Sequence, residues 1–557
     1  MTIRRFKHWG WGYEDQQPSA AQLRATAAAI AQQLCLPLGE IESPVALADV
    51  QLEPPRVVAP AQLAEICQSD THARASHALG KSYVDVVDGF RGRFAHPPDF
   101  VAQPRDEADV ERLLEWCAAE RVAAIPFGGG TSVVGGVTPD VPSAYNGAVT
   151  LDLRALDRVR EIDAVSRAAL IDAGASGPLL ERQLAEHRLT LRHFPQSFEY
   201  ATLGGWIATR AGGHFAMGPT HIEDFVESVR AITPAGVWES RRLPGSGAGV
   251  SPDRMLAGSE GALGVITRAW MRVQPRPAHR RSAGVRFASF AAGAECVREL
   301  SQSGLSPSNC RLIDAREAAM TMAGDGEHAL LVLGFESTDH PVDTALARAL
   351  AICRDHGGHA PAQRTARDGG AGPDGGDDAV GAWRQAFLGA PYARDALVAL
   401  GVLAETFETA ITWERFAAMH ERVTTRAEQA LREACGEGGR VTARFTHVYA
   451  DGPAVYYTAI APARRGEEVE QWRHVKRAVS DELIAAGATI THHHAVGRDH
   501  RPWYDRQRPE PFAAALAGAK AAVDPCGVMN PGVLLDPRTA VDAGAQLDES
   551  PRTGAVI

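Results

Sequence analysis

The alternation of apolar and polar positions predicts a mixed series of helices and strands from about residue 97 onward. Residues 109–120 form one amphipathic helix, whose apolar face consists of Val110, Leu113, Leu114 and Cys117. Strand-like apolar runs lie at 122–127, 147–153, 168–173, 226–233 and 264–273. Between them, Ser176-Gly177-Pro178 is typical of a helix start with proline in the first turn. The pattern predicts an α/β region that ends near Pro275 and Pro277.

A second α/β region follows, because helical and strand-like patterns alternate again up to about residue 500. Its expected strands lie at 328–336, 400–407, 441–450 and 453–460. The first 95 residues look helical, with an alanine-rich stretch from Ala20 to Leu34. The end of the chain is polar and weakly patterned, which is typical of disorder. We therefore divide the chain into an N-terminal helical region at 1–95, the two α/β parts at 96–277 and 278–500, a C-terminal helical segment at 501–536 and a disordered tail at 537–557.

Composition excludes several classes of function. The chain has 557 residues, of which 45% are hydrophobic and 22% charged, so it can bury a large core. Its net charge of −11 argues against holding nucleic acid or an anionic membrane by bulk attraction. Only Lys7, Lys81, Lys476 and Lys520 are lysines among the 57 basic residues, so arginine dominates, which favours bidentate binding of phosphate or carboxylate.

The eight cysteines are scattered and form no CxxC pair, so neither a disulfide framework nor a zinc ribbon is indicated. The basic start of the chain has no apolar stretch behind it, and no run of 18 apolar residues occurs. We expect a cytoplasmic protein without a signal peptide or a membrane span.

The glycine-rich segment Pro126–Ser132 (PFGGGTS) follows a predicted strand, where bare backbone N–H groups can bind an anion. It is neither a P-loop, since the Lys-Ser/Thr ending is missing, nor a GxGxxG motif, since Val133 replaces a glycine. A tight turn without a ligand explains this segment equally well. Three more segments, Gln196–Gly205, Trp206–Gly213 and Gly258–Gly264, are also rich in small residues. Together the four segments indicate an extended ligand with a pyrophosphate and a ring.

Taken in order, PFGGGTSVVGG, SFEYATLGGW, TRAGG and GSEGALGVITRAWMRVQPRP resemble the FAD-binding domain of the vanillyl-alcohol oxidase superfamily. Within it, the chain from Trp9 to Leu535 resembles the alkylglycerone-phosphate synthase family. The resemblance implies an α/β (α+β) fold: a two-part FAD-binding domain at 96–277 and an α/β cap domain with an antiparallel sheet at 278–500. The segment 501–536 would then close on the FAD site.

The resemblance also implies non-covalent FAD, with its pyrophosphate on Pro126, Phe127, Gly128, Gly129, Gly130, Thr131 and Ser132. Further FAD contacts are implied for Gln196, Ser197, Phe198, Glu199, Tyr200, Ala201, Thr202, Thr209, Arg210, Ala211, Gly212, Glu260, Gly261, Ala262, Leu263, Gly264, Val265 and Ile266.

Three consecutive histidines, His492, His493 and His494, form the most conspicuous reactive group. On an extended chain adjacent side chains point to opposite sides, so at most two of them face one cavity. A metal ion would need ligands from elsewhere, and we expect none. Neutral imidazoles can instead move protons or stabilise developing charge. Solvated loop histidines are the alternative, which three in a row make less attractive.

Tyr456 lies in an apolar strand, where a tyrosine is ordinarily part of the core. The resemblance gives it proton transfer in catalysis, whereas its neighbour Tyr457 faces the other side of the strand. Composition selects no particular arginine, but the resemblance implies that Arg394 binds a substrate phosphate and that Arg311 supports the active site. Their proximity in sequence suggests that Asp314 and Asp395 orient these two guanidinium groups.

The implied reaction exchanges the acyl group of acyl-dihydroxyacetone phosphate for a fatty alcohol, through an adduct at flavin N5, and yields an ether lipid precursor. Such an FAD-dependent alkyl transferase takes small lipid substrates in an apolar channel, can touch a membrane to collect them, and is commonly a homodimer.

The main alternative is an FAD-linked 2-hydroxy-acid dehydrogenase or oxidase, of the D-lactate or glycolate type, to which the ending Asp524–Gly532 is similar. Those enzymes resemble HxGDGNxH with a later EHGxG. Here the corresponding stretches begin at His447 and His492 and lack the second histidine, the asparagine and the glutamate. This departure favours the synthase type. A flavin-binding protein without catalysis would need the cavity but not the tyrosine and histidines.

Overall fold

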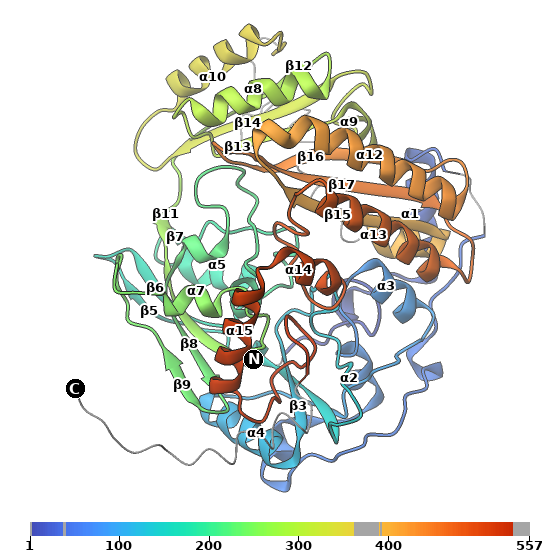
Figure 1. Cartoon of the computed structure of the whole chain (residues 1–557), viewed down its shortest axis with the longest axis vertical. Helices are drawn as coiled ribbons and strands as arrows, with labels where there is room; N and C mark the ends of the chain where they lie inside the picture. The colour runs from blue at the N-terminus through green and yellow to red at the C-terminus, as the bar shows by residue number, and fades with distance from the viewer. Residues whose placement is uncertain (1–2, 37–39, 361–388, 390–392, 538–557) are drawn as a thin grey trace.

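The computed structural model describes residues 3–36, 40–360, 389 and 393–537, so the tail expected at 537–557 lies outside the described residues except for Pro537. Figure 1 shows two bodies stacked along the long axis, with the N-terminal segment beside both. Short 3-10 helices connect the larger elements: η1 (Glu14–Gln16), η2 (Leu47–Asp49), η3 (Ala61–Ile66), η4 (Leu153–Ala155) and η5 (Ile222–Asp224).

A small sheet with parallel inner strands carries the first glycine-rich loop at the end of its edge strand. Its order is β1 (Cys67–Gln68), β2 (Phe100–Ala102), β4 (Gly147–Asp152) and β3 (Val122–Phe127). Helix α4 (Glu107–Glu120) leads into β3; Asp106 caps its N-terminus by accepting from the Asp109 N–H, and Arg121 ends it in the left-handed conformation. Helix α4 is followed directly by the buried strand β3. The loop that follows β3 lines the cavity described below.

An antiparallel five-stranded sheet forms the other half of this body. Its order is β5 (Val159–Asp163), β6 (Ala168–Asp172), β10 (Val265–Arg272), β8 (Val226–Thr233) and β9 (Gly236–Glu239). Its helices are α5 (Gly177–Ala185), α6 (Leu203–Thr209) and α7 (Pro252–Leu256), and β7 (Leu189–Thr190) pairs with β11 (Gln274–Pro275). A core of its own stabilises this half, with Trp206, Leu203 and Met271 fully or almost fully buried.

The cap is one antiparallel six-stranded sheet. Its order is β12 (His279–Phe287), β14 (Ala329–Ser337), β13 (Asn309–Ile313), β16 (Arg440–Val448), β17 (Pro453–Pro462) and β15 (Val402–Ala410). Its helices are α8 (Phe290–Gln302), α9 (Ala315–Met320), α10 (Asp343–Asp355), α12 (Trp413–Cys435) and α13 (Glu468–Ala485). In Figure 1, α8, α10 and α12 lie on the outward face, so the inward face is left to border the cavity.

The N-terminal segment joins the two bodies. It contains α1 (Ala20–Gln33), α2 (Thr71–Ser76) and α3 (Tyr83–Phe90). Its apolar side chains share one core cluster with the cap, including Trp9, Phe90 and Phe407. Lys7 forms a buried ion pair with Asp395 at 2.8 Å. A buried pair of this kind needs both partners, so the segment is held tightly to the cap.

The C-terminal segment returns to the first body through α14 (Arg501–Gln507) and α15 (Glu510–Val523). After α15 the chain runs beside β3, where Asn530 Nδ2 donates to the carbonyl oxygens of Gly136 and Glu260 at 3.0 and 2.7 Å. Within the described residues, no helix combines the length and the apolar character that crossing a membrane requires.

Most elements agree with the sequence patterns. The strands expected at 122–127 and 226–233 have these bounds, and the apolar face of α4 is buried as predicted. The remaining expected strands are present with ends shifted by a few residues, which is usual where an apolar run continues into a turn. The domain boundaries stay a prediction.

Candidate active site

One cavity of about 540 Å³ lies where the glycine-rich loops meet the inward face of the cap sheet. Most residues selected from the sequence line it: Pro126, Phe127, Gly128, Gly129, Gly130, Thr131, Ser132, Gln196, Ser197, Ala201, Thr202, Thr209, Ala211, Gly212, Glu260, Gly261, Gly264, Ile266, Arg311, Arg394, Tyr456, His493 and His494. Residues far apart in the sequence therefore form a single site of the size of a cofactor-binding cavity.

The other selected residues lie outside the cavity wall. They are Phe198, Glu199, Tyr200, Arg210, Ala262, Leu263, Val265 and His492. Phe198 stacks on Trp206, and the guanidinium of Arg210 pairs with Glu223. Ala262, Leu263 and Val265 are buried in the core. These residues support the loops, because alternate positions of a short segment cannot all face one cavity.

The glycine-rich loop after β3 packs tightly against the segment 196–202. A Cβ on Gly129 would lie 2.0 Å from the Tyr200 carbonyl oxygen, and one on Gly128 would lie 2.1 Å from Thr202 Oγ1. Gly130 has φ of +63°, which glycine adopts without strain. Only bare backbone fits between the two segments, and it presents N–H groups of the kind that bind a pyrophosphate. The residues present therefore fit the FAD implied by the sequence.

Glu260 connects the flavin-binding loops to the histidine segment. Its two carboxyl oxygens accept from the Val496 and Gly497 N–H groups at 2.9 and 2.7 Å. Burial raises the pKa of this carboxyl to about 7, although both hydrogen bonds lower it. The contact fixes the end of the histidine segment on the cavity wall.

The histidine segment is bent, so the expectation of an extended chain is wrong. Glu408 on β15 accepts from the backbone N–H groups of His492, His493 and His494, at 2.6, 3.2 and 3.0 Å, and from the Thr491 hydroxyl. Gathering three successive N–H groups on one carboxylate curls the chain. As a result the neighbours His493 and His494 both line the cavity, while His492 Nε2 lies 2.8 Å from the Tyr449 hydroxyl.

Glu408 is fully enclosed, and its charge is compensated by its surroundings. Burial would raise the pKa of this carboxyl, but the imidazoles of His493, His494 and His492 outweigh burial and keep it well below its usual range. Burial likewise lowers the pKa of His494 well below its usual range, so its imidazole is neutral near pH 7. A neutral imidazole can accept or donate a proton there.

Tyr456 faces the cavity and Tyr457 does not. Tyr457 is completely buried, stacks on Phe407 and has its hydroxyl 3.0 Å from His420 Nδ1. The ring of Tyr456 lies 5.5 Å from that of His494. The alternation of side chains along β17 therefore separates a core tyrosine from one that can take part in chemistry.

Arg444 is a second buried guanidinium beside Tyr456. Its Cζ lies 3.9 Å from the centre of the Tyr456 ring, and Nη1 donates to Glu317 at 2.6 Å. Arg311 is also buried, where its Nη2 donates to the His214 and Thr446 carbonyl oxygens, and burial lowers the pKa of this guanidinium to about 9. Two arginines thus bring positive charge to the reacting end of the cavity.

Arg394 lines the cavity and is oriented by its neighbours. Nη1 donates to the Lys81 carbonyl oxygen at 2.8 Å, and Nη2 lies 3.4 Å from Thr406 Oγ1. The carboxylates suggested as partners of the two arginines have other roles. Asp314 caps α9 by accepting from the Glu317 N–H, and Asp395 pairs with Lys7.

A third part of the wall is apolar. It is formed by side chains of the N-terminal segment and of the cap, namely Trp11, Ile30, Leu34, Met320, Leu397, Ala404 and Ile460. The cavity thus joins a loop able to bind phosphate, a cluster of titratable groups and an apolar region.

Sequence reasoning missed Glu408, Arg444 and His447. Each is an ionisable residue whose two neighbours in its strand are apolar or threonine, and all three are buried. That pattern is a usable signal, because burying an ionisable group is costly unless it has partners or a function.

Comparison with known proteins agrees with this site. A family model described as FAD binding domain matches residues 98–240, and one described as FAD linked oxidases, C-terminal domain, matches residues 276–534. Alkyldihydroxyacetonephosphate synthase of Trypanosoma brucei brucei is 28% identical, over 84% of this chain and 78% of the relative. The enzyme of the same name from Dictyostelium discoideum is 27% identical, over 93% and 88%. The chain thus carries both domains of the FAD-linked flavoproteins and is similar over most of its length to the alkyldihydroxyacetonephosphate synthases.

The fold of this flavoprotein is that of the vanillyl-alcohol oxidase type. A solved alkyldihydroxyacetonephosphate synthase structure superposes with a TM-score of 0.77 at 24% identity, covering 94% of this chain and 98% of the other. The two-part FAD-binding fold and the cap expected from the sequence are therefore confirmed. The flavoprotein binds FAD and acts on small molecules.

Proposed function

We propose that this flavoprotein is an FAD-dependent alkyldihydroxyacetonephosphate synthase. It would exchange the acyl group of acyl-dihydroxyacetone phosphate for a fatty alcohol, forming an ether bond and releasing a fatty acid. The observation that carries this proposal is the continuity of the cavity from the glycine-rich loop, past Tyr456 and His494, to the apolar wall around Leu34 and Leu397. A 2-hydroxy acid has no chain that needs such a wall.

Each part of the cavity has a role in this reaction. The backbone of Gly128–Ser132 would hold the pyrophosphate of FAD, which when bound supplies an electron-accepting isoalloxazine ring. Arg394 binds the substrate phosphate through guanidinium N–H groups that its contacts with Lys81 and Thr406 leave in a fixed plane. The apolar wall takes the acyl or alkyl chain.

Proton transfer falls to Tyr456 and the histidines. The carbon next to the ester oxygen must lose a proton before the acyl group leaves, and the incoming alcohol must lose one when it attacks. The phenol oxygen of Tyr456 and a ring nitrogen of His494 face the same end of the cavity and can hold these protons. Arg311 and Arg444 compensate negative charge as the carboxylate departs.

The test is an anaerobic experiment on the purified holoprotein. Palmitoyl-dihydroxyacetone phosphate is added first and hexadecanol second, while the visible flavin band is recorded and products are identified by mass spectrometry. Loss of the band with the first addition, its return with the second, and formation of hexadecyl-dihydroxyacetone phosphate with palmitate would support the proposal. A band that ignores both additions but bleaches with D-lactate or glycolate would assign the protein to the 2-hydroxy-acid dehydrogenases.

We also propose a homodimer in the cytoplasm that touches membranes to collect its substrates. The family resemblance supports the dimer, and substrates with long chains support membrane contact. Large apolar side chains available for such contact include Val250 and Phe512, which are 89% and 50% exposed. Light scattering after gel filtration measures the assembly, and co-sedimentation with phospholipid vesicles measures the contact.

A further inference from the structure

The beginning of the chain forms a tight hook, residues 6–13, that brings a tryptophan to the active site. Phe6 and Tyr13 form an antiparallel bridge, and the Lys7 N–H donates to the Gly12 carbonyl oxygen at 3.1 Å. Gly12 has φ of +108°, which lets the chain turn back without strain. Trp11 lies near the tip of the hook and lines the cavity.

Asp395 fixes the hook beside the arginine that is proposed to bind the substrate phosphate. Its two carboxyl oxygens accept from the Trp11 N–H at 3.2 and 3.1 Å, and Oδ2 also accepts from Lys7 Nζ at 2.8 Å. A Cβ on Gly10 would lie 2.4 Å from the same Oδ2, so only glycine fits there. Because Asp395 directly follows Arg394 in the sequence, these contacts hold the backbone of Trp11 close to Arg394.

The indole of Trp11 has a hydrogen-bond donor that no group in the described part of the chain accepts. Trp11 is 5% exposed, and its Nε1 is buried without a hydrogen-bond partner among those residues. An indole N–H can only donate, and in a buried tryptophan it ordinarily has a partner. An unmet donor on a residue of the cavity wall indicates that a ligand supplies the acceptor.

Trp206 shares this feature but lies in another part of the wall. It also lines the cavity, and its Nε1 is buried without a partner among the described residues. It lies on α6 of the flavin-binding body and stacks on Phe198. Trp11 belongs instead to the apolar part of the wall, together with Leu34 and Leu397. Trp11 is therefore the one of the two that is placed to contact a lipid substrate.

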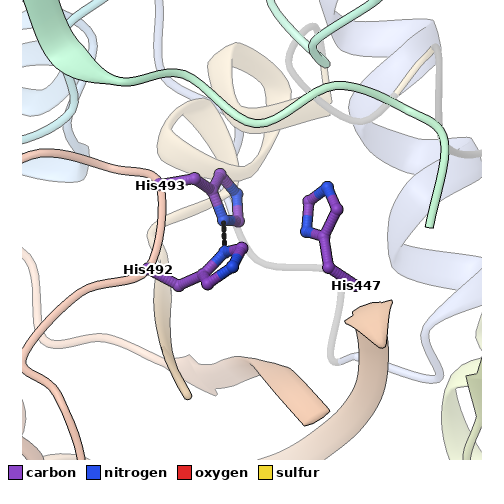
Figure 2. A group of neighbouring side chains, drawn as sticks. All are labelled: His447, His492 and His493. Carbon is purple, nitrogen blue, oxygen red and sulfur yellow. Dashed lines mark hydrogen bonds between the residues drawn. The ribbon is translucent and has the colours of Figure 1, made fainter. Parts of the chain in front are cut away.

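The histidine rings at the edge of the cavity differ from Trp11 because their facing nitrogens have partners. The Nδ1 atoms of His492 and His493 lie 3.2 Å apart and are joined by the dashed line in Figure 2. His447 lies across from them, and its Nε2 donates to the Gly213 carbonyl oxygen at 2.8 Å. The unmet donor of Trp11 is therefore not a general feature of the nitrogen-bearing rings around this cavity.

We propose that Trp11 Nε1 donates to the ester carbonyl oxygen of the acyl substrate and so distinguishes this substrate from the alkyl product. The inference rests on the proposed function, from which it takes both molecules. The ester lies between the phosphate, which Arg394 would bind, and the acyl chain, which the apolar wall would take. Trp11 is fixed close to Arg394 and belongs to that wall.

The alkyl product carries the same phosphate but has no carbonyl oxygen at this place, so it leaves the indole N–H unmet. A site that hydrogen-bonds one group of its ligand discriminates against an analogue that lacks the group. Trp11 thereby favours the replacement of product by new substrate.

The test compares two lipids that differ only at this carbonyl oxygen, namely 1-palmitoyl-glycerol 3-phosphate and 1-hexadecyl-glycerol 3-phosphate. Both lack the ketone of the substrate, so neither has the activated proton and neither is consumed. Calorimetry on the holoprotein, below the concentration at which the lipids form micelles, gives the dissociation constants. The wild type should bind the ester about fivefold more tightly than the ether, as one hydrogen bond predicts. Trp11→Phe should bind both equally, with an affinity for the ether within about twofold of the wild type.

The matched control is Trp9→Phe. Trp9 lies on the same hook, is 2% exposed and also has a buried Nε1 without a partner in the described part of the chain, but it does not line the active-site cavity. Its replacement removes the same N–H from the same hook, so this variant should keep the wild-type preference for the ester. If Trp11→Phe loses its FAD or its circular dichroism spectrum, Trp11→Leu takes its place.

Equal affinity of the wild type for the two lipids would overturn the role of Trp11, and this measurement needs no variant. A wild-type preference retained in Trp11→Phe would also overturn it. Neither result bears on whether an ether bond is formed, because the exchange reaction is measured with other compounds. If neither lipid bound to the wild type, the proposed substrate class would fail together with the role of Trp11.

Discussion

Glu408 on β15 lies directly opposite Tyr456 on β17 in the antiparallel cap sheet, and Arg444 on β16 lies opposite the same tyrosine on its other side. Cross-strand neighbours are among the most rigidly placed pairs in a protein. The sheet therefore sets the spacing between the tyrosine, the arginine and the carboxylate that curls the histidine segment. Chemistry at this end of the cavity depends on strand register.

Replacing Glu408 with glutamine should disrupt the histidine segment. The amide keeps one acceptor oxygen but presents a donor to N–H groups that need an acceptor. Each charge-assisted hydrogen bond that is lost is worth about 1.5–3 kcal/mol. We therefore expect kcat to fall about a hundredfold or more. Steady-state product formation, with FAD content as a check of folding, measures the effect. Glu437→Gln, at an exposed position, is the control, and equal activity of both variants would contradict the argument.

Arg444→Lys should slow catalysis while leaving FAD binding intact. Lysine keeps the charge but cannot lie flat against the Tyr456 ring and pair with Glu317 at once. We expect a drop in kcat of about tenfold, equivalent to about 1.4 kcal/mol, with little change in KM. Stopped-flow recording of the flavin band separates the first half-reaction from the second. Arg316→Lys, whose side chain is 63% exposed, should match the wild type.

Arg394→Lys should weaken substrate binding more than turnover. A single ammonium group cannot replace two parallel guanidinium N–H donors on a phosphate. KM for the phosphate substrate should rise about tenfold, and added inorganic phosphate should inhibit this variant less than the wild type. Arg348→Lys on the surface of α10 is the control. An unchanged KM would show that another residue binds the phosphate.

Gly129→Ala should prevent FAD binding. The new Cβ would lie 2.0 Å from the backbone oxygen of Tyr200, so the loop must move away from the segment that it packs against. The purified variant should contain less than about a tenth of the wild-type flavin, as measured by absorbance, because a loop displaced by even about 1 Å no longer presents its N–H groups to the pyrophosphate. Gly247→Ala, where a Cβ would meet open space, should keep a full complement of FAD.

Glu260 should make the FAD-free protein less stable as pH rises. Its pKa is about 7 in the folded chain but near 4.5 when unfolded. Between these values the unfolded chain releases a proton that the folded chain keeps, so the free energy of unfolding falls by about 3 kcal/mol as pH rises. Below the unfolded pKa this stability is fully present, and it is lost as pH rises through the folded pKa. Urea unfolding from pH 5 to 8 measures the slope.

Glu260→Gln should remove this part of the pH dependence, although the loss of a hydrogen bond to Val496 or Gly497 lowers stability at every pH. Glu199→Gln, exposed in the neighbouring flavin-binding segment, should retain the wild-type slope. A wild-type slope in Glu260→Gln would assign the pH dependence to other groups.

The sequence was most informative where local patterns decide structure. Apolar runs located β3 and β8, and glycine spacing located the loops that line the cavity. The sequence was least informative where strand register and long-range contacts determine the structure. The apolar pattern of one strand does not say which residue of the neighbouring strand lies opposite each of its residues. Glu408 and Arg444 could not be paired with Tyr456 for this reason. The bend at His492–His494 was missed because the carboxylate that causes it lies on another strand.

The wall built from α1 has a consequence for how such proteins diverge. Ile30 and Leu34 border the apolar part of the cavity, yet they precede both regions matched by the flavoprotein family models, which begin at residue 98. Substitutions there can lengthen or shorten the space for a lipid chain without disturbing a group that binds flavin or moves a proton. Chain-length preference can therefore evolve in one segment while the reaction is conserved in others, and exchanging α1 between relatives is a route to redesigning it.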